Sequence, residues 1–395
     1  LVALAALAAT SAFAQSSVTI SGNVDLGYRS VTQNGTNSAN VVTSRKTSNV
    51  AGNGAEGWTS SQVTLKVVED MGNGTVAGYT NEMNLASLGT GADASGDSLG
   101  TIRQSFVSLA NAKNGEFRLG YQYTLEDQIQ GGVGRATPTG NVGGRVQNFA
   151  FSVNPAAAAS TLEGSGTLTS GHITRANAFQ YASPTMSGFQ ALVQFAQVTD
   201  KTNNGTANEQ STKAKISAIA GRYSQGPLNL GLSYQSTRSE DNTLGAANSE
   251  KKIKTSATQL AANYDFGPAK VFLNTFSRKS DVTEGIGHTT ALPNFAVFNN
   301  GGTLKRTGTD LGVSAPFGSV TLFASVGSGK YKADQDGTGA VANDLNIKAH
   351  LLGATYDLSK RTSLNAYYAT AKVTADYSSN ELSKKTIGAG LRHSF

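Results

Sequence analysis

The chain has 395 residues, of which 38% are hydrophobic and 15% charged, with 45 glycines, 7 prolines and no cysteine. Both fractions are low, which excludes a conventional apolar core of this size but permits a thin outer apolar band around a polar interior. The missing cysteines exclude disulfides and thiolate metal sites, and the net charge of +6 is scattered, which argues against a nucleic-acid partner.

The start of the chain has the pattern of an export signal. Residues 1–9 are continuously apolar, and Ala12, Phe13 and Ala14 form an A-x-A cleavage site. We therefore predict a cleaved signal peptide at residues 1–14, partly missing at its start, and a mature domain over residues 15–395. No later apolar run reaches the roughly 18–20 residues that a membrane helix needs. Such a protein is periplasmic, secreted or an outer-membrane barrel.

Alternation of apolar and polar residues, the signature of strands, begins at residues 18–31 and recurs along the chain. A polar loop of about 25 residues is expected after the first strand. In chain order the predicted strands are 18–31, 58–69, 75–83, 101–109, 116–124, 175–182, 189–197, 215–223, 228–236, 258–266, 270–278, 307–315, 320–327, 347–358, 362–371 and 385–395.

The connections between these strands alternate in length. Short turns alternate with long segments rich in Gly, Asn, Ser, Thr and Asp. This alternation is typical of a transmembrane barrel with short periplasmic turns and long external loops, and about 16 strands leave an aqueous channel. The longest connection covers residues 125–172, and a loop of that length is usually functional.

The last predicted strand ends the chain on an apolar-aromatic face. Ile387, Leu391 and Phe395 share the face expected to point outward, and Arg392 is expected in the lumen near the periplasmic rim. A barrel must close, so we predict that this strand pairs with the preceding strand and with the first strand.

Several stretches resemble the general trimeric porins of Gram-negative bacteria, of the β-proteobacterial type. They are QSSVTISGNVDLGY, LKVVEDMGNG, RQSFVSLANAKNGEFRLGYQYT, YASPTMSGF, YDLSKRTSLNAYY and GLRHSF. The resemblance implies an all-β fold, a homotrimer of 16-stranded antiparallel barrels, and a third external loop that folds inward to narrow each pore. It also implies an outer-membrane location and that the chain's end is read by the insertion machinery. The expected surroundings are outer-membrane lipid and lipopolysaccharide.

Three positions depart from the family's pattern. The family commonly has arginine where this chain has Gln62 and Tyr121. Gln62 is expected to point inward, which weakens the basic wall there, and Tyr121 is expected to point outward toward a neighbour or lipid. The arginine that opens the family's sixth strand aligns nearer Thr174, which leaves Arg175 one step out of phase.

Charged residues at inward positions are candidates for the constriction, because rings of charge set pore selectivity. We expect Arg103, Lys66 and Arg118 to form a basic wall, opposed by Glu126 and Asp127 with Glu82 nearby. The long loop adds Arg135 and Arg145. The alternative is that these are ordinary solvated charges of the lumen. The basic balance favours a weak anion preference.

The predicted function is passive diffusion of small hydrophilic solutes and ions through an outer-membrane pore. The alternatives are a substrate-specific channel and, with less support, a surface adhesin. An enzyme would need a cluster of Asp, Glu and His at one rim, and neither this cluster nor a cofactor or metal motif is apparent. We therefore predict no catalytic residues and no cofactor.

Overall fold

The computed structural model describes residues 16–36, 42–52, 61–85, 99–133, 175–202, 210–243, 250–282, 302–334, 345–375 and 381–395. Within these ranges no helix is long and apolar enough to cross a membrane. The one helix found there is α2 (Leu125–Val133). The strands are β1 (Ser16–Thr36), β2 (Val42–Gly52), β3 (Gln62–Asp70), β4 (Thr75–Leu85), β5 (Leu99–Asn111), β6 (Gly115–Tyr123), β7 (Arg175–Ala182), β8 (Phe189–Thr202), β9 (Gln210–Gln225), β10 (Leu228–Thr243), β11 (Glu250–Asp265), β12 (Lys270–Val282), β13 (Gly302–Phe317), β14 (Val320–Asp334), β15 (Leu345–Asp357), β16 (Thr362–Ala375) and β17 (Glu381–Ser394).

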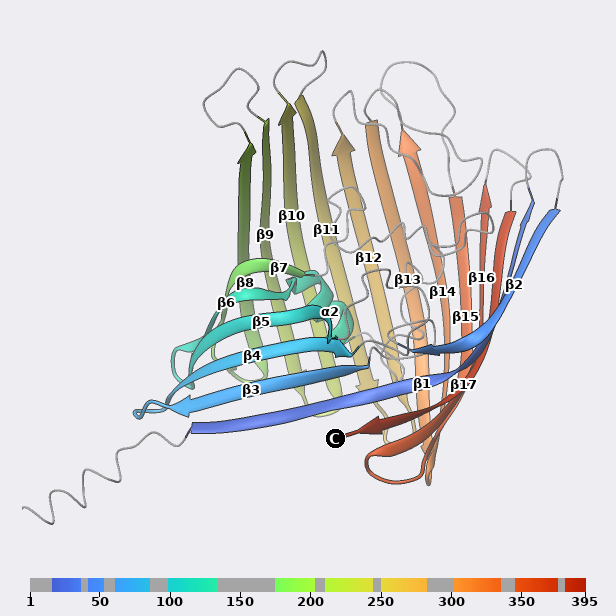
Figure 1. Cartoon of the computed structure of the whole chain (residues 1–395), viewed down its shortest axis with the longest axis horizontal. Helices are drawn as coiled ribbons and strands as arrows, with labels where there is room; N and C mark the ends of the chain where they lie inside the picture. Colours follow the sequence, from blue (N-terminus) through green and yellow to red (C-terminus); the bar gives the residue numbers. More distant parts are fainter. Residues whose placement is uncertain are drawn as a thin grey trace, which may run out of the picture.

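These strands form one closed antiparallel barrel (Figure 1). Each strand from β3 to β16 pairs with the next, and β1 pairs with β17 on one edge and with β2 and β3 on the other. Because β2 and β3 share one place beside β1, the seventeen described strands fill sixteen positions, as the sequence predicts. Closure pairs the last strand with the first, so the sheet has no open first or last edge in the lipid.

The closing strand has the partners that the sequence predicts. β17 pairs with β16 on one side and with β1 on the other. Ile387, Leu391 and Phe395 are all exposed on the outer face. At the end of the chain, Phe395 and Gly22 exchange both backbone hydrogen bonds at 3.0 Å.

The first loop is shorter than the sequence predicts, and this prediction was wrong. β1 continues to Thr36, and β2 returns beside it, with Leu26 opposite Gly52 and Thr36 opposite Val42. Ser, Thr, Val and Asn dominate both segments. Polar strands of this composition pair well where both faces meet water, and apolar alternation does not reveal them.

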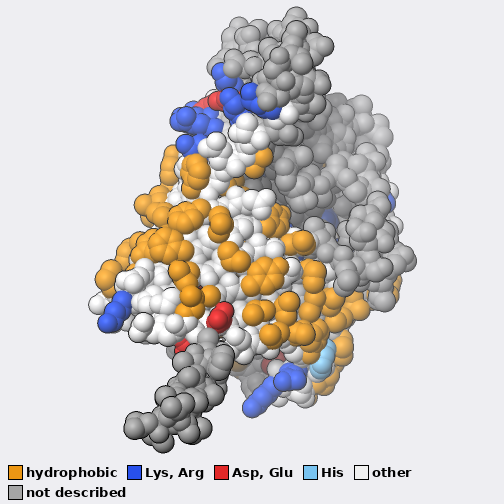
Figure 2. All heavy atoms as spheres, turned by 60° about the vertical axis from the view of Figure 1, so that its left-hand side comes forward, with side chains coloured by type: hydrophobic (Ala, Val, Ile, Leu, Met, Phe, Trp, Pro, Cys, Tyr) orange, Lys and Arg blue, Asp and Glu red, His pale blue; other side chains and the backbone are white. Residues whose placement is uncertain are grey.

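Apolar side chains form a band on the outside of the barrel. Figure 2 shows this orange band, with charged side chains above and below it. Below the band, short turns join neighbouring strands, such as the residue pairs 226–227 and 318–319. Phe117 packs beside Phe179 and Tyr181 near this rim, with ring centroids 5.7 and 4.7 Å apart. Such an aromatic girdle suits the interface of a membrane.

The wall is low on one side. β3 and β6 have 9 residues and β7 has 8, whereas β9, β10, β11 and β13 have 16. At the top of this low wall the chain leaves β6 and enters α2, which lies against β8, β9, β10 and β11. Residues 134–174, the remainder of the predicted third loop, lie outside the described ranges, as do the predicted signal peptide and Trp58.

Candidate pore constriction

The inward face of each strand follows from the register, because directly paired residues point to the same side of a sheet. On β3 the exposed Lys66 is paired with Thr80 of β4, and Thr64 is paired with Glu82. On β3, Thr64 and Lys66 alternate with the apolar Val63, Leu65 and Val67, which face outward. Thr64 and Lys66 therefore face the lumen, and so do their partners on β4. Lys66 and Glu82 therefore point inward, as predicted.

Arg103 occupies a β-bulge. Glu82 is paired with Gln104 and Met83 with Ile102, which leaves Arg103 as an extra residue of β5. A bulge redirects a side chain that regular alternation would place elsewhere. The guanidinium of Arg103 accordingly meets Glu82, with Nε donating to Oε1 at 2.5 Å, and Nη1 donates to Asn84 at 3.1 Å.

Tyr123 links Arg103 to Arg175. The phenol oxygen accepts a hydrogen bond from Nη2 of Arg103 at 2.5 Å and one from Arg175 at 3.4 Å. Arg175 also lies over the Tyr123 ring, 4.8 Å from its centroid. Gln104 donates to the second oxygen of Glu82 at 2.9 Å. The result is a cluster of Glu82, Arg103, Tyr123 and Arg175 that joins β4, β5, β6 and β7. It contains two arginines and one carboxylate.

Arg118 lies lower on the same wall. Its Nη2 donates to Glu116 at 2.8 Å, and its guanidinium lies over the Phe106 ring at 5.0 Å. The register pairs Arg118 with Gln180, which is buried. Arg118 therefore faces inward, as predicted, and it is half-buried with a carboxylate partner beside it.

The sequence after β6 has the signals of a helix start. Thr124 caps α2, because its hydroxyl accepts a hydrogen bond from the Asp127 backbone at 3.4 Å. Glu126 and Asp127 lie in the first turn, where carboxylates are favoured by the helix dipole. Leu125, Ile129 and Val133 recur every four residues and share one face. The prediction of one long loop over residues 125–172 missed these signals.

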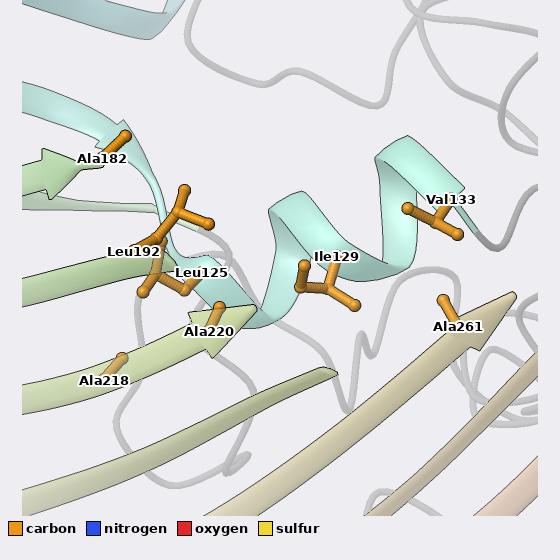
Figure 3. Close-up of a cluster of buried hydrophobic side chains, with 8 residues drawn as sticks. All are labelled: Leu125, Ile129, Val133, Ala182, Leu192, Ala218, Ala220 and Ala261. Carbon is orange, nitrogen blue, oxygen red and sulfur yellow. The ribbon is translucent and has the colours of Figure 1, made fainter. Parts of the chain in front are cut away.

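That apolar face packs on the inner wall of the barrel (Figure 3). Leu125 and Ile129 are fully buried and contact a surface of small side chains on β9 and β11. The members of this cluster are Leu125, Ile129, Val133, Ala182, Leu192, Ala218, Ala220 and Ala261. Gly231 of β10 lies so close to Ile129 that an added Cβ would be 3.0 Å from the Ile129 side chain.

Glu126 fastens the helix to β12, the strand next to β11. Its Oε1 accepts hydrogen bonds from Nε of Arg278 at 2.6 Å and lies 2.5 Å from Nη2. Glu126 is 1% exposed and Arg278 2%, so this ion pair is fully buried. The register pairs Arg278 with Arg306, and the carboxylate of Glu126 therefore lies beside a second cation-bearing strand position.

Polar side chains hold the rest of α2. Gln128 donates to Gln180 at 2.7 Å and accepts a hydrogen bond from Arg222 at 3.1 Å. At the other end, Asn263 donates to the Val133 carbonyl at 2.9 Å. Asp127 is buried, with 5% of its surface exposed. These contacts hold α2 in a fixed position against the inner wall of the pore.

The predicted constriction residues fall into two groups and a remainder. Arg103, Glu82, Arg118 and Lys66 lie on the low wall, and Glu126 and Asp127 lie on α2. Arg135 and Arg145 are outside the described residues. That these side chains set ion selectivity stays a prediction, since it depends on how ions move through the pore.

Comparison with known proteins gives the family. A family model described as Gram-negative porin matches residues 1–376. The chain is similar to outer membrane porin protein 32 of Delftia acidovorans, at 31% identity over 395 residues that cover 99% of this chain and 93% of that protein. The chain belongs to the Gram-negative porin family.

Other similar proteins match over a smaller part of their length or at lower sequence identity. The porin is 30% identical over 239 residues to an outer membrane porin protein of Bordetella pertussis, which covers 55% of this chain and 57% of that protein. An anion-selective porin from Comamonas acidovorans has a similar structure, with TM-score 0.62 and 24% identity, over 96% of this chain and 100% of that one. OmpT of Vibrio cholerae aligns with TM-score 0.57 and 13% identity over 96% and 98%. The porin is therefore an outer-membrane channel protein, and its strands span that membrane.

Sequence reasoning missed two arginines of this porin that contact α2. Arg278 and Arg222 both lie at inward positions of predicted strands, so alternation alone could have placed them in the lumen. Nothing in the linear pattern shows that Arg278 meets Glu126, because 152 residues separate the partners.

Proposed function

We propose that this porin is a general diffusion channel whose water-filled pore admits small hydrophilic solutes and ions, with a weak preference for anions. The low wall and α2 together supply a constriction lined by fixed charges. Passive conduction, without a catalytic step, is the proposed activity, because Arg103, Arg118 and Arg278 are each held in an ion pair along the wall rather than grouped around a reacting centre.

The observation that carries the anion preference is the charge of the inner wall. Along the described strands, inward arginines and lysines outnumber inward aspartates and glutamates. The cations are Arg29, Lys66, Arg103, Arg118, Arg222, Arg278, Arg306, Lys384 and Arg392, and the carboxylates that face them are Asp25, Glu82, Glu116 and Asp310 on the strands and Glu126 and Asp127 on α2. A positive lumen raises the local anion concentration, and the effect decreases with added salt. The anion selectivity of the Comamonas porin is in line with this proposal.

Within this wall we assign a selectivity role to Arg103. It lies at the top of the low wall, and its removal would leave Glu82 with Gln104 and Tyr123 as its remaining named partners. The field at the constriction would then become more negative. Lys66 and Arg118 would act in the same direction, opposed by Glu126 and Asp127.

A planar-bilayer experiment tests both the channel and the role of Arg103. Purified porin should give stepwise conductance, and under a salt gradient its reversal potential should have the sign of an anion-preferring channel. R103A should lower the anion-to-cation permeability ratio by roughly twofold, which corresponds to an interaction below about 1 kcal/mol. K113A removes one cation from a short turn outside the pore and is the matched control. An unchanged potential in R103A would remove Arg103 from the selectivity mechanism, and absence of conductance would refute the channel itself.

We further propose a homotrimer. The outer face of the low wall carries large exposed apolar side chains, among them Leu119 at 62% and Val107 at 53% exposure. Tyr79, Asn81 and Ser105 add a hydrogen-bonded polar patch on the same face. Such a mixed surface suits contact with a second copy better than contact with lipid. In the same bilayer recordings, channels should close in three equal steps.

A further inference from the structure

Three glutamine side chains meet at the point where β6 turns into α2. Gln180 of β7 and Gln194 of β8 are register partners on neighbouring strands, and Gln128 lies in the first turn of the helix. Gln180 and Gln194 are only 2% and 3% exposed, although both lie at inward positions of a polar lumen. Buried amides are costly unless they are hydrogen-bonded, so the partners of this glutamine cluster indicate its role.

The cluster binds the backbone on both sides of the junction. The Leu125 N–H donates to Oε1 of Gln194 at 3.2 Å. It belongs to the first turn of the helix, where N–H groups have no partner within the helix. On the strand side, the carbonyl oxygen of Tyr123 accepts hydrogen bonds from the side-chain amides of Gln128 and Gln194, both at 2.9 Å. These two side chains therefore fix where the strand stops and the helix begins.

The direction of each bond in the cluster is fixed by groups that can act in only one way. Arg222 can only donate, and its Nη2 donates to Oε1 of Gln128 at 3.1 Å. The backbone groups at the junction are likewise either a pure donor or a pure acceptor. Gln128 and Gln194 must therefore both turn their NH2 groups toward Gln180, whose Oε1 accepts from them at 2.7 and 3.1 Å.

Gln128 also determines where a cation of the lumen lies. Arg222 extends from an inward position of β9, and its Nε has no partner, so within the described residues its guanidinium hydrogen-bonds to Gln128 alone. Arg103, Arg118 and Arg278 each have a carboxylate partner. Arg222 forms no ion pair within the same part of the chain, so its charge adds to the positive field beside α2.

We propose that Gln180 and Gln194 are positioning residues of the pore constriction. Through Gln128 they fix both the start of α2 and the place of Arg222, and they set the ion selectivity without carrying a charge themselves. This role rests on the proposed diffusion function, because it concerns the side chains that hold the charged constriction in place.

Two isosteric variants with the same change in charge test the directions of these bonds. Q180E keeps an acceptor for both NH2 groups, so amide exchange of residues 125–133 should stay within about threefold of the wild type. Q194E keeps the bond from Leu125 but loses both donor bonds and turns a carboxylate toward the Tyr123 carbonyl. Exchange should then be faster by on the order of tenfold or more. Equal exchange in Q180E and Q194E would overturn the positioning role.

A neutral variant tests the effect on ion selectivity. Q194M removes the hydrogen bonds of Gln194 without adding a charge. Its anion-to-cation permeability ratio should fall toward one by roughly 1.5-fold, because the fixed charges of the constriction move apart. The matched control is Q235M, which removes an equally buried inward amide whose oxygen has no hydrogen-bond partner among the described residues, and it should keep the wild-type ratio. Faster exchange in Q194M with an unchanged ratio would overturn the effect on selectivity.

The two measurements separate this role from the diffusion function itself. The barrel should close in every variant, because backbone ladders hold β7 and β8, and gel migration without heating selects the folded protein. Amide exchange does not require conduction, so absence of conductance in the wild type would refute the diffusion function alone. Normal wild-type conductance with unchanged exchange in both Q194E and Q194M would refute the positioning role alone.

Discussion

Gly22 lies where the first strand meets the end of the last strand. A Cβ at this position would lie 2.3 Å from the Gln62 carbonyl oxygen and 2.7 Å from the Phe395 ring. Backbone atoms cannot move aside without breaking the ladder, so any side chain here opposes closure. The requirement for glycine thus comes from close approach between β1, β3 and the end of β17, without any unusual backbone angle.

We predict that G22V lowers the yield of closed barrel severalfold, because the displaced ring and carbonyl disrupt the contact between the first and last strands. Folded and unfolded forms can be counted on a gel run with and without heating. G132A is the control, since a Cβ on Gly132 meets nothing within 4 Å. Equal folded fractions in G22V and the wild type would show that the contact between β1 and β17 tolerates a side chain at position 22.

At the scale of elements, α2 is held by a buried ion pair and an apolar face. Glu126 and Arg278 have lost contact with water, so removal of either partner leaves a buried charge without its main counter-charge. Such a change typically costs about 3–5 kcal/mol, whereas replacing both partners with apolar residues is often close to neutral. The ion pair therefore fixes the position of the helix more than it stabilises the barrel, whose strands are held by their own ladders.

We predict that R278M releases α2 from the wall and leaves the barrel closed. Amide exchange of residues 125–133 should become faster by on the order of 100-fold, and the open-channel current should become noisier. The double variant E126M/R278M should recover much of the protection, because neither charge of this pair is left buried without the other. Unchanged exchange in R278M would show that the apolar face alone holds the helix.

At the scale of the whole molecule, one seam completes the barrel. β17 joins the last and first parts of the chain through register contacts from Asn23 opposite Ser394 to Thr36 opposite Glu381. Phe395 ends this seam with two backbone hydrogen bonds to Gly22, and its ring is half-exposed at the membrane edge. Aromatic side chains favour this interfacial depth.

Deletion of Phe395 is predicted to reduce assembled trimer in the outer membrane severalfold, with little change in the strand content of the detergent-refolded protein. The reason is that the seam loses its last pair of hydrogen bonds and its interfacial anchor, while the other ladders persist. Western blots of membrane fractions and circular dichroism measure the two quantities. F395Y keeps both features and should assemble normally. Normal trimer yield after the deletion would contradict this role.

The sequence by itself determined the class, the number of positions around the barrel and the orientation of its strands. Period-two alternation and the spacing of short turns are local, so they can be read without knowing which strands meet. The inward direction of Lys66, Glu82 and Arg118 follows from the same rule. The sequence also contained the cap and apolar stripe of α2, although loop composition concealed them.

Only the tertiary structure decided which charges meet. Arg103 faces Glu82 because of a bulge, which breaks alternation and has no reliable local signature. Glu126 meets Arg278 because α2 lies along the inner wall of β8 to β11, which brings Glu126 to the neighbouring β12, a strand far along the chain. Lys279 of β12 lies opposite Lys305 of β13, and this pairing depends on the register between the two strands. Local patterns specify which way a side chain points; its partner depends on where the folded chain brings distant residues together.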